Sequence, residues 1–420
     1  MASKIISIHA RQVLDSRGNP TVEADAKTAK GVFSAIVPSG ASTGSFEALE
    51  LRDKSSAYGG KSVLKAVENV NKKIAPNVSG MDAEAQKEID SVMLELDGTE
   101  NKAGLGANAI LSVSLACARA GAASKGVHLF EHLGSLAGNK KFCLPVPQLN
   151  VLNGGKHAGL EEDIQEQMLF PSGAKSFSDA LQMSVETYHV LGKMLKKKFG
   201  AQATLLGDEG GFVPPVKSVQ ERLEFMLAAI KEAGYEGRIK IALDPAASEF
   251  FDGASYGLYG KKYSAGEMVD VYAELVQTYP IVSIEDGLAE EDWQGWKELN
   301  ARLGGKIHVV GDDLLVTNAT RIRRAIEEKS CNALLLKVNQ IGTLSESIEA
   351  ANLSFKNGWN VVVSHRSGET EDPFISDLVV GLGSGQSKFG GPARSERNAK
   401  YNQLLRIEGA LGEKAVFGKK

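Results

Sequence analysis

The stretch ALLLKVNQ at residues 333–340 is an apolar run that ends on a lysine, and its form is repeated along the second half of the chain. The related runs are IKIALD (239–244), IVSIED (281–286), IHVVGDD (307–313) and NVVVSHRSG (360–368). Amphipathic stretches separate them, and one of these, residues 264–279, begins with Ser264 and Glu267 at capping-box spacing. Near-continuous apolar strands that alternate with helices are typical of a parallel sheet covered by helices. The second half therefore predicts an α/β architecture.

Charged side chains mark the carboxyl ends of these runs: Asp244, Glu285, Asp312, Lys337 and His365. The successive intervals are 41, 27, 25 and 28 residues, and all but the first match one strand–helix unit. Parallel barrels carry their active sites at the carboxyl ends of the strands. The pattern therefore predicts a TIM-like (β/α)8 barrel with one charged mouth. An open doubly wound sheet is the alternative, although it would aim fewer successive strands at one point.

The first half has a different pattern. Residues 4–37 alternate apolar and polar positions around the turn signal SRGNP (16–20), which predicts an antiparallel meander. A loop of small residues, PSGASTGS (38–45), precedes several helical stretches, and the run 107–126 ends on Gly126 as helices often do. We predict a smaller α+β N-terminal domain over residues 1–140 and a barrel domain over residues 141–420, joined near the proline-containing segment AGNKKFCLPVPQ (137–148).

Composition excludes several classes of protein. The formal net charge of -4 leaves no basic footprint for nucleic acid. No stretch approaches the ~20 apolar residues of a membrane span, and Arg11 interrupts the N-terminus before a signal-peptide core could develop. The three cysteines are widely spaced and form no C-x-x-C pair, which favours free thiols in a reducing cytosol. We therefore expect a cytoplasmic protein.

Three strand-end carboxylates, Asp244, Glu285 and Asp312, would repel one another without a counter-ion. Hard oxygen ligands with no cysteine or histidine beside them favour Mg²⁺ over Zn²⁺. Each carboxylate taken alone could equally cap the helix that follows it. Three in register, followed by a lysine, favour a metal site.

Lys337 stands at the end of an apolar strand, where an ammonium group must be paired or have its pKa lowered. Such a lysine can act as a general base or as a Schiff-base nucleophile. A structural ion pair with a carboxylate is the plain alternative.

Candidate anion ligands follow the later strands. SHRSG (364–368) places His365, Arg366 and Ser367 together, and arginine offers a planar fork for phosphate or carboxylate. GLGSGQSK ends in Lys388, a further cation. Either motif alone would also fit an ordinary turn.

Two earlier loops carry further polar groups. GDEGGF (207–212) places Glu209 between glycines, where the backbone can approach a ligand closely, and a carboxylate beside bound anions could have a raised pKa and act as an acid. NGGKHAG (153–159) carries His157, and Gln165 and Glu166 follow it. Without a barrel, both loops would read as solvated turns.

Together these residues resemble the enolase family over essentially the whole chain. The motifs that carry the resemblance are DSRGNPTVE, PSGASTGSFEALELRD, NVLNGGKHAG, GDEGGF, SIEDG, GDDLLVTN, LLLKVNQIGT, VSHRSGETED and SERNAKYNQLLRIE. The resemblance implies a small α+β domain followed by an irregular barrel. That barrel would open with two antiparallel strands and two helices, which would account for the long interval before Glu285.

The resemblance also implies the reaction, a reversible Mg²⁺-dependent dehydration of 2-phosphoglycerate to phosphoenolpyruvate in glycolysis. Lys337 would remove the proton at C2, and Glu209 would protonate the departing C3 hydroxyl. Two Mg²⁺ ions would take part in turnover. The metal ligands it implies are Asp244, Glu285 and Asp312 for one ion, and Ser42, in a mobile lid at 38–45, for the second.

The remaining roles implied by the resemblance concern the substrate. Arg366 and Ser367 would bind phosphate and Lys388 the carboxylate. Gln165 and Glu166 would contact the substrate near the leaving group, with His157 on the closing loop, and His365 would also bind the substrate. The sequence departs from the commoner family pattern at Pro245, Gln167, Ser387 and Phe389.

Three other hypotheses stay open at this point. A Mg²⁺-dependent acid-sugar dehydratase or racemase would keep the carboxylates but should lack the SGASTG and SHRSGETED motifs. A Schiff-base aldolase would use Lys337 as a nucleophile. A binding or structural protein with a vestigial site is the third. By family resemblance we expect a homodimer or homo-octamer in the cytoplasm, with an additional cell-surface or secreted pool as a family trait.

Overall fold

The computed structural model describes residues 3–40 and 44–418, so the predicted metal ligand Ser42 lies outside the described residues. The N-terminal part opens with a three-stranded antiparallel sheet in the order β1-β2-β3, which confirms the predicted meander. Its strands are β1 (Ser7–Leu14), β2 (Pro20–Thr28) and β3 (Gly31–Ile36). Along β2, Val22, Ala24 and Ala26 are fully buried at alternate positions, as the period of a half-buried strand requires.

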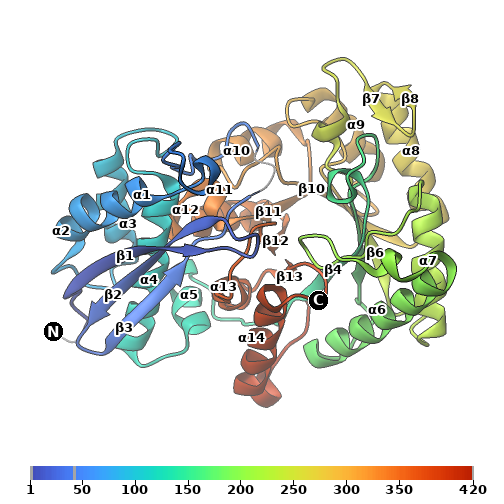
Figure 1. The fold of residues 1–420 in the computed structure, drawn as a ribbon. Coiled ribbons are helices and arrows are strands. Elements are labelled where there is room, and N and C mark those ends of the chain that lie inside the picture. Colours follow the sequence, from blue (N-terminus) through green and yellow to red (C-terminus); the bar gives the residue numbers. More distant parts are fainter. Residues whose placement is uncertain (1–2, 41–43, 419–420) are drawn as a thin grey trace.

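Helices cover this sheet and complete the N-terminal part (Figure 1). They are α1 (Leu64–Asn69), α2 (Ala75–Val78), α3 (Gln86–Asp97), α4 (Ala107–Lys125) and α5 (Leu129–Ala137). The small-residue helix α4 packs against β2 and β3, because alanine and serine allow close approach of the two backbones. It ends at Gly126 in the left-handed conformation, as predicted.

The second part is a closed barrel of eight strands in the order β10-β11-β12-β13-β4-β5-β6-β9. Closure confirms the predicted barrel and excludes the open sheet. The strands are β4 (Val146–Asn153), β5 (Glu166–Phe170), β6 (Lys240–Asp244), β9 (Ile281–Glu285), β10 (His308–Gly311), β11 (Ala333–Leu336), β12 (Asn360–Ser364) and β13 (Gly385–Lys388). β5 is antiparallel to both of its neighbours, whereas the other pairs are parallel. The barrel is therefore irregular, as the resemblance implied.

Helices surround the barrel on its outside (Figure 1). They are α6 (Phe177–Phe199), α7 (Val219–Glu232), α8 (Ala265–Thr278), α9 (Trp293–Leu303), α10 (Ala319–Glu328), α11 (Val338–Ile341), α12 (Leu344–Lys356), α13 (Phe374–Leu382) and α14 (Ser395–Leu411). The capping box predicted at the start of α8 is present, because Ser264 and Glu267 each accept from the other's backbone N–H. No described helix is long and apolar enough to cross a membrane.

The long interval between Asp244 and Glu285 has a different cause from the predicted one. β4, β5, α6 and α7 all precede Asp244, so the opening antiparallel strands and helices cannot lengthen this interval. A 3₁₀ turn (Ala247–Phe250) and a hairpin of β7 (Tyr256–Leu258) and β8 (Lys261–Tyr263) are inserted there, ahead of α8. The regular strand–helix rhythm begins only after this insertion.

The N-terminal part packs on the α11–α13 side of the barrel, with α5 against α13 and α4 against α11. Partly buried ion pairs join the two parts. Arg119 Nη2 lies 2.5 Å from Asp372 Oδ1, and Lys102 Nζ lies 2.8 Å from Glu346 Oε1. Directly after β3, Ser39 N donates to Gly368 O at 2.8 Å, which ties this end of the N-terminal sheet to the segment after β12.

Candidate active site

The predicted charged residues meet at the carboxyl rim of the barrel. Asp244, Glu285 and Lys388 are the last residues of β6, β9 and β13. Asp312 follows β10 after Gly311, and Lys337 and His365 follow β11 and β12 directly. One cavity at this rim is lined by His157, Gln165, Glu166, Glu209, Asp244, Asp312, Lys337, His365, Arg366, Ser367 and Lys388, together with Ala246, Asp286, Asp313 and Ser364.

Glu166 shows why the irregular strand matters. It is the first residue of β5, and because β5 runs antiparallel, its amino end lies at the same rim as the carboxyl ends of the other strands. Glu166 pairs in register with Asp244 of β6. The reversed direction of β5 thus brings Glu166 to the same rim as the charged residues at the carboxyl ends of the other strands.

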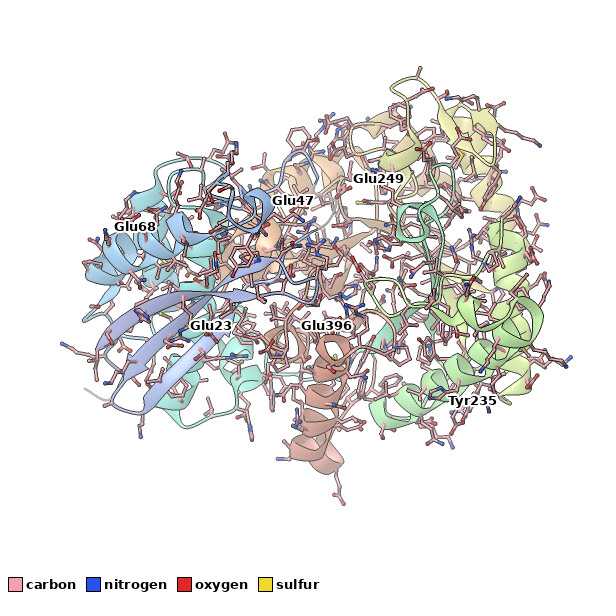
Figure 2. The ribbon with its side chains drawn as sticks, viewed as in Figure 1. Glu23, Glu47, Glu68, Tyr235, Glu249 and Glu396 are labelled. Carbon is pink, nitrogen blue, oxygen red and sulfur yellow. The ribbon has the colours of Figure 1, made fainter. Side chains whose placement is uncertain are left out.

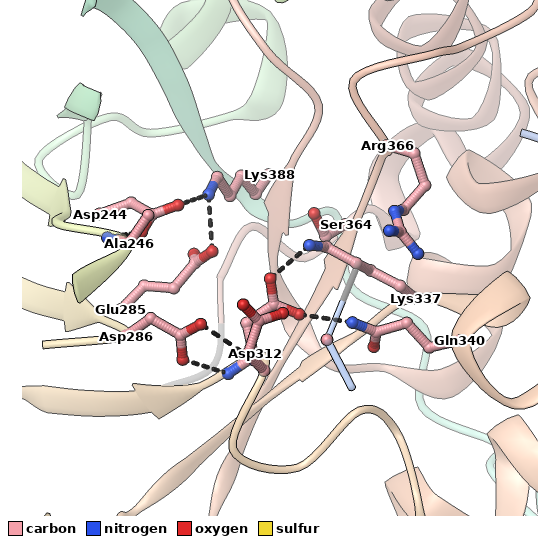
Figure 3. Close-up of polar contacts among 12 residues, drawn as sticks. Asp244, Ala246, Glu285, Asp286, Asp312, Lys337, Gln340, Ser364, Arg366 and Lys388 are labelled. Atoms are coloured by element: carbon pink, nitrogen blue, oxygen red, sulfur yellow. Dashed lines mark hydrogen bonds and ion pairs between the residues drawn. The ribbon is translucent and has the colours of Figure 1, made fainter. Parts of the chain in front are cut away.

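The ammonium group of Lys388 lies among several acidic side chains, two of which are drawn with their contacts in Figure 3. Its Nζ lies 2.7 Å from both Asp244 Oδ2 and Glu285 Oε1, and 3.2 Å from Glu166 Oε2. Burial acts to lower the pKa of Lys388, but the charges of Asp244, Glu166 and Glu285 outweigh it and raise the pKa well above its usual value. Lys388 is therefore a fixed cation among these acids.

Lys337 forms a second ion pair, with Asp312 (Figure 3). Burial opposes the ammonium form, but the charge of Asp312 outweighs it and raises the pKa of Lys337 to about 12. Gln340 Nε2 donates to the other carboxylate oxygen of Asp312 at 2.7 Å. Of the two alternatives predicted for Lys337, an ion pair or a lowered pKa, the structure shows the ion pair.

The acidic side chains here fit a divalent cation. Glu285 is buried, and its Oε2 has no hydrogen-bond partner among the described residues. Burial, and then repulsion by Asp244, raise the pKa of Glu285 well above its usual value, so its negative charge lacks sufficient compensation. Oxygen donors in such surroundings suit a hard cation.

The side chains that already lie close enough to share one ion differ from the predicted set. In the described chain, Asp286, Asp312 and Asp313 form one group whose ligand atoms all lie within 4.8 Å, and His157, Glu166 and Glu209 form another. The predicted trio Asp244, Glu285 and Asp312 is neither of these groups, because Lys388 lies between the first two. An ion held by that trio would require Lys388 to move away.

Glu209 and His365 form the opposite side of the cavity. The loop carrying Glu209 pairs with the end of β4, where Phe212 N donates to Val151 O at 2.9 Å. Glu209 Oε2 lies 3.2 Å from His365 Nε2. Burial acts to raise the pKa of Glu209, but its interaction with His365, which includes a hydrogen bond to the carboxylate, outweighs burial and lowers the pKa well below its usual value.

A carboxyl with a raised pKa lies next to Glu209. Burial, and then the charge of Glu209, raise the pKa of Glu166 well above its usual value. His157 Nδ1 lies 3.6 Å from Glu166 Oε1. These opposite shifts favour a proton on Glu166 over one on Glu209.

Arg366 meets a partner that sequence reasoning missed. Glu47 accepts from Arg366 Nη1 at 2.8 Å and from Nη2 at 3.1 Å, and both side chains are buried. Figure 2 shows Glu47 between the N-terminal part and the barrel. Glu47 belongs to the quoted motif PSGASTGSFEALELRD, so the motif held the signal, but nothing local indicated its partner.

Two further residues were missed. Asp286, the second acid of SIEDG, accepts from the backbone N–H groups of Asp312 and Asp313 at 2.9 Å each, and its own φ is +43°. Arg397, in SERNAKYN, is fully buried and donates to the carbonyl oxygens of Arg366 and Ser367. Both stood beside recognised motifs, but their side-chain directions depend on the closed barrel.

Comparisons with known proteins agree along the whole chain. A family model for the enolase N-terminal domain matches residues 5–133, and one for the enolase C-terminal TIM barrel domain matches residues 141–420. The chain is 57% identical over 420 residues to the enolase of Methanopyrus kandleri, covering 99% of this chain and 98% of that protein. It is 58% identical over 422 residues to the enolase of Thermococcus kodakarensis (99% and 97% covered) and 56% over 418 residues to that of Methanococcus vannielii (99% and 97%). The chain therefore belongs to the enolase family.

Proposed function

We propose that this chain catalyses the reversible dehydration of 2-phosphoglycerate to phosphoenolpyruvate. The observation that carries the proposal is one cavity that holds a lysine and a glutamate at separate positions, Lys337 and Glu209, together with strand-end acids and two further cations. Removal of a proton next to a carboxylate concentrates negative charge, and loss of a hydroxyl requires a proton donor. The cations of the cavity could stabilise the negative charge, and Glu209 could donate the proton to the hydroxyl.

Two Mg²⁺ ions complete the proposed site. Asp244, Glu285 and Asp312 would hold one, and Ser42 would help to hold the second with the substrate's phosphate. Such ions, when bound, supply positive charge that stabilises the developing carbanion. The unpartnered buried oxygen of Glu285 supports the assignment.

Lys337 is the proposed base at C2. Its pair with Asp312 favours the ammonium form, which cannot accept a proton. The pairing must therefore weaken before catalysis, and Asp312 must find another positive partner. Once Lys337 has released its own proton to solvent, its amine lone pair accepts the C2 proton.

Glu209 is the proposed acid at C3. It must carry a proton when the hydroxyl leaves, although its surroundings favour the proton on Glu166. A substrate anion bound closer to Glu209 than to Glu166 would disfavour the Glu209 carboxylate more strongly and so shift the proton toward Glu209. Glu166 is therefore proposed as the group from which Glu209 draws its proton.

The other polar groups would hold the substrate. We propose Arg366 and Ser367 for the phosphate and Lys388 for the carboxylate, since their donors face the same cavity. His157, Gln165 and His365 would surround the leaving hydroxyl together with Glu166.

The domain boundaries, the oligomeric state and the cellular location are also proposals. We propose domains at residues 1–140 and 141–420, with a lid at 38–45. We further propose a homodimer or homo-octamer that works in the cytoplasm.

The test is an absorbance assay for phosphoenolpyruvate formed from 2-phosphoglycerate. We expect activity with Mg²⁺, its loss on addition of EDTA, and its return with excess Mg²⁺. Folded, Mg²⁺-loaded protein without activity would refute the proposal. Borohydride with a carbonyl substrate should leave Lys337 unlabelled, whereas labelling would favour an aldolase.

A further inference from the structure

The two ring nitrogens of His365 face partners of opposite character. Nδ1 lies 2.7 Å from Arg397 Nη1, and Nε2 lies 3.2 Å from Glu209 Oε2. A guanidinium group has only donors and stays charged, so Nδ1 can take part only as an acceptor. The proton of a neutral ring must then be on Nε2, where it points at the carboxylate.

The surroundings keep this ring neutral. His365 is buried, with 2% of its surface exposed, and burial is the main cause that lowers its pKa to about 4. Attraction by Glu209 opposes this shift, while the charge of Arg397 adds to it. Near neutral pH, His365 therefore influences Glu209 through an N–H hydrogen bond and not through a full positive charge.

Arg397 is held rigidly enough to enforce this choice. It lies in the first turn of α14 and has no exposed surface. Its Nη1 donates to Arg366 O at 2.5 Å, and its Nη2 donates to Ser367 O at 2.5 Å and to Asp208 O at 3.0 Å. One guanidinium thus ties the loop after β12 to the residue preceding Glu209.

The backbone also restricts the ring from its other side. At Gly390, where φ is +85°, an added Cβ would lie 2.9 Å from His365 Cε1 and 2.6 Å from Glu209 O. His365 N donates to Lys388 O at 2.9 Å, which fixes the start of its side chain. The ring therefore has little freedom to turn and exchange its partners.

We propose that Arg397 is a positioning residue for the acid step, because it holds His365 in the Nε2–H tautomer that donates to Glu209. In the other tautomer, the Nε2 lone pair would face Glu209 and compete for the proton meant for the C3 hydroxyl. Arg397 thereby keeps His365 from acting as a base toward the proposed acid. The catalytic part of this inference rests on the proposed function.

The first test measures the tautomer directly, without substrate. Two-bond ¹H–¹⁵N correlation spectra of protein labelled with ¹⁵N-histidine distinguish a protonated ring nitrogen from one that carries a lone pair. We expect His365, assigned by the loss of its signals in His365→Gln, to show a lone pair at Nδ1 and a proton at Nε2 near pH 7. A proton on Nδ1 would overturn the proposal, whether or not the protein proves to be an enolase.

The second test compares two amides at position 365. A glutamine amide reaches about as far as Nε2 and can still donate to Glu209, whereas an asparagine amide reaches only the position of Nδ1. We expect the ratio of phosphoenolpyruvate formation to C2 proton exchange to be about tenfold higher in His365→Gln than in His365→Asn, since one donor to the acid is kept. Equal ratios would overturn the proposal.

Arg397→Met is the test variant of the positioning residue, because it removes the donor to Nδ1 and keeps much of the side chain's length; Arg397→Lys, which keeps the charge and one donor, is its matched control and should lose less. In Arg397→Met we expect C2 exchange close to that of the parent chain and phosphoenolpyruvate formation lower by about 10- to 100-fold. If exchange and elimination fall in the same proportion, Arg397 is merely structural. Failure of the parent chain itself to form phosphoenolpyruvate would refute the proposed function and leave the spectroscopic result standing.

Discussion

His132 should make the N-terminal part sensitive to acid. It lies in α5 with no exposed surface, and neither of its ring nitrogens has a hydrogen-bond partner among the described residues. Burial lowers its pKa from 6.5 to about 4, so the folded chain disfavours the imidazolium. In the unfolded chain this penalty is absent.

The sign and size of the effect follow from linkage. A folded-state pKa below the unfolded value means that the unfolded chain binds more protons, so stability is full above about pH 6.5 and falls as the pH drops toward 4. A difference of about 2.5 pKa units corresponds to about 3 kcal/mol when the shift is fully expressed. Between pH 7 and pH 4.5 the loss attributable to His132 should be about 2 kcal/mol.

Denaturant unfolding followed by circular dichroism at a fixed protein concentration measures this loss. His132→Leu removes the titrating group, so its free energy of unfolding should fall by about 2 kcal/mol less than that of the parent chain over this pH range. His189→Leu, which removes an exposed imidazole from α6, is the matched control. Parallel pH profiles for the parent chain and His132→Leu would refute the reasoning.

The other predictions concern the site. Lys337→Ala should lower C2 proton exchange, followed by deuterium incorporation, by about 10²- to 10⁴-fold, the usual contribution of a general base. Glu209→Gln should retain measurable exchange while phosphoenolpyruvate formation falls by a similar factor; equal loss of exchange in both variants would contradict this division of roles. Glu47→Ala removes the carboxylate that pairs with the buried guanidinium of Arg366, so denaturant unfolding should show a loss of about 3 kcal/mol, with Glu47→Gln less affected. Gly390→Ala should cost about 2 kcal/mol or more, because φ is +85° and the methyl group would meet a backbone oxygen at 2.6 Å; an unchanged unfolding midpoint would refute the close approach.

The strand ends were the most predictable part of the molecule. Apolar runs with a charged residue at the end are a local pattern, and the barrel places Asp244, Glu285, Asp312, Lys337 and His365 at one rim as the spacing indicated. The meander and the capping box at Ser264 were also local in origin. Each depends on neighbours a few residues away, whose chemistry can be read along the chain.

The positions of Glu166 and Glu47 could not be predicted from the residues next to them in the sequence. Glu166 reaches the rim because β5 runs against its neighbours, and Glu47 reaches Arg366 only because the N-terminal part packs on the barrel. The family resemblance suggested the first and gave no role to the second. Partners hundreds of residues apart are chosen by how the two parts pack, which no local pattern encodes.

The sequence alone therefore determined the elements, the charged groups at the strand ends and, by resemblance, the family. The tertiary structure alone decided which charges meet: Lys388 between Asp244 and Glu285, and Arg397 against His365. It also decided the direction of each pKa shift, including the lowered pKa of Glu209 beside His365. The physical reason is that pairing and desolvation act through space. They take effect only when closure of the barrel removes water and brings distant side chains within a few ångströms of one another.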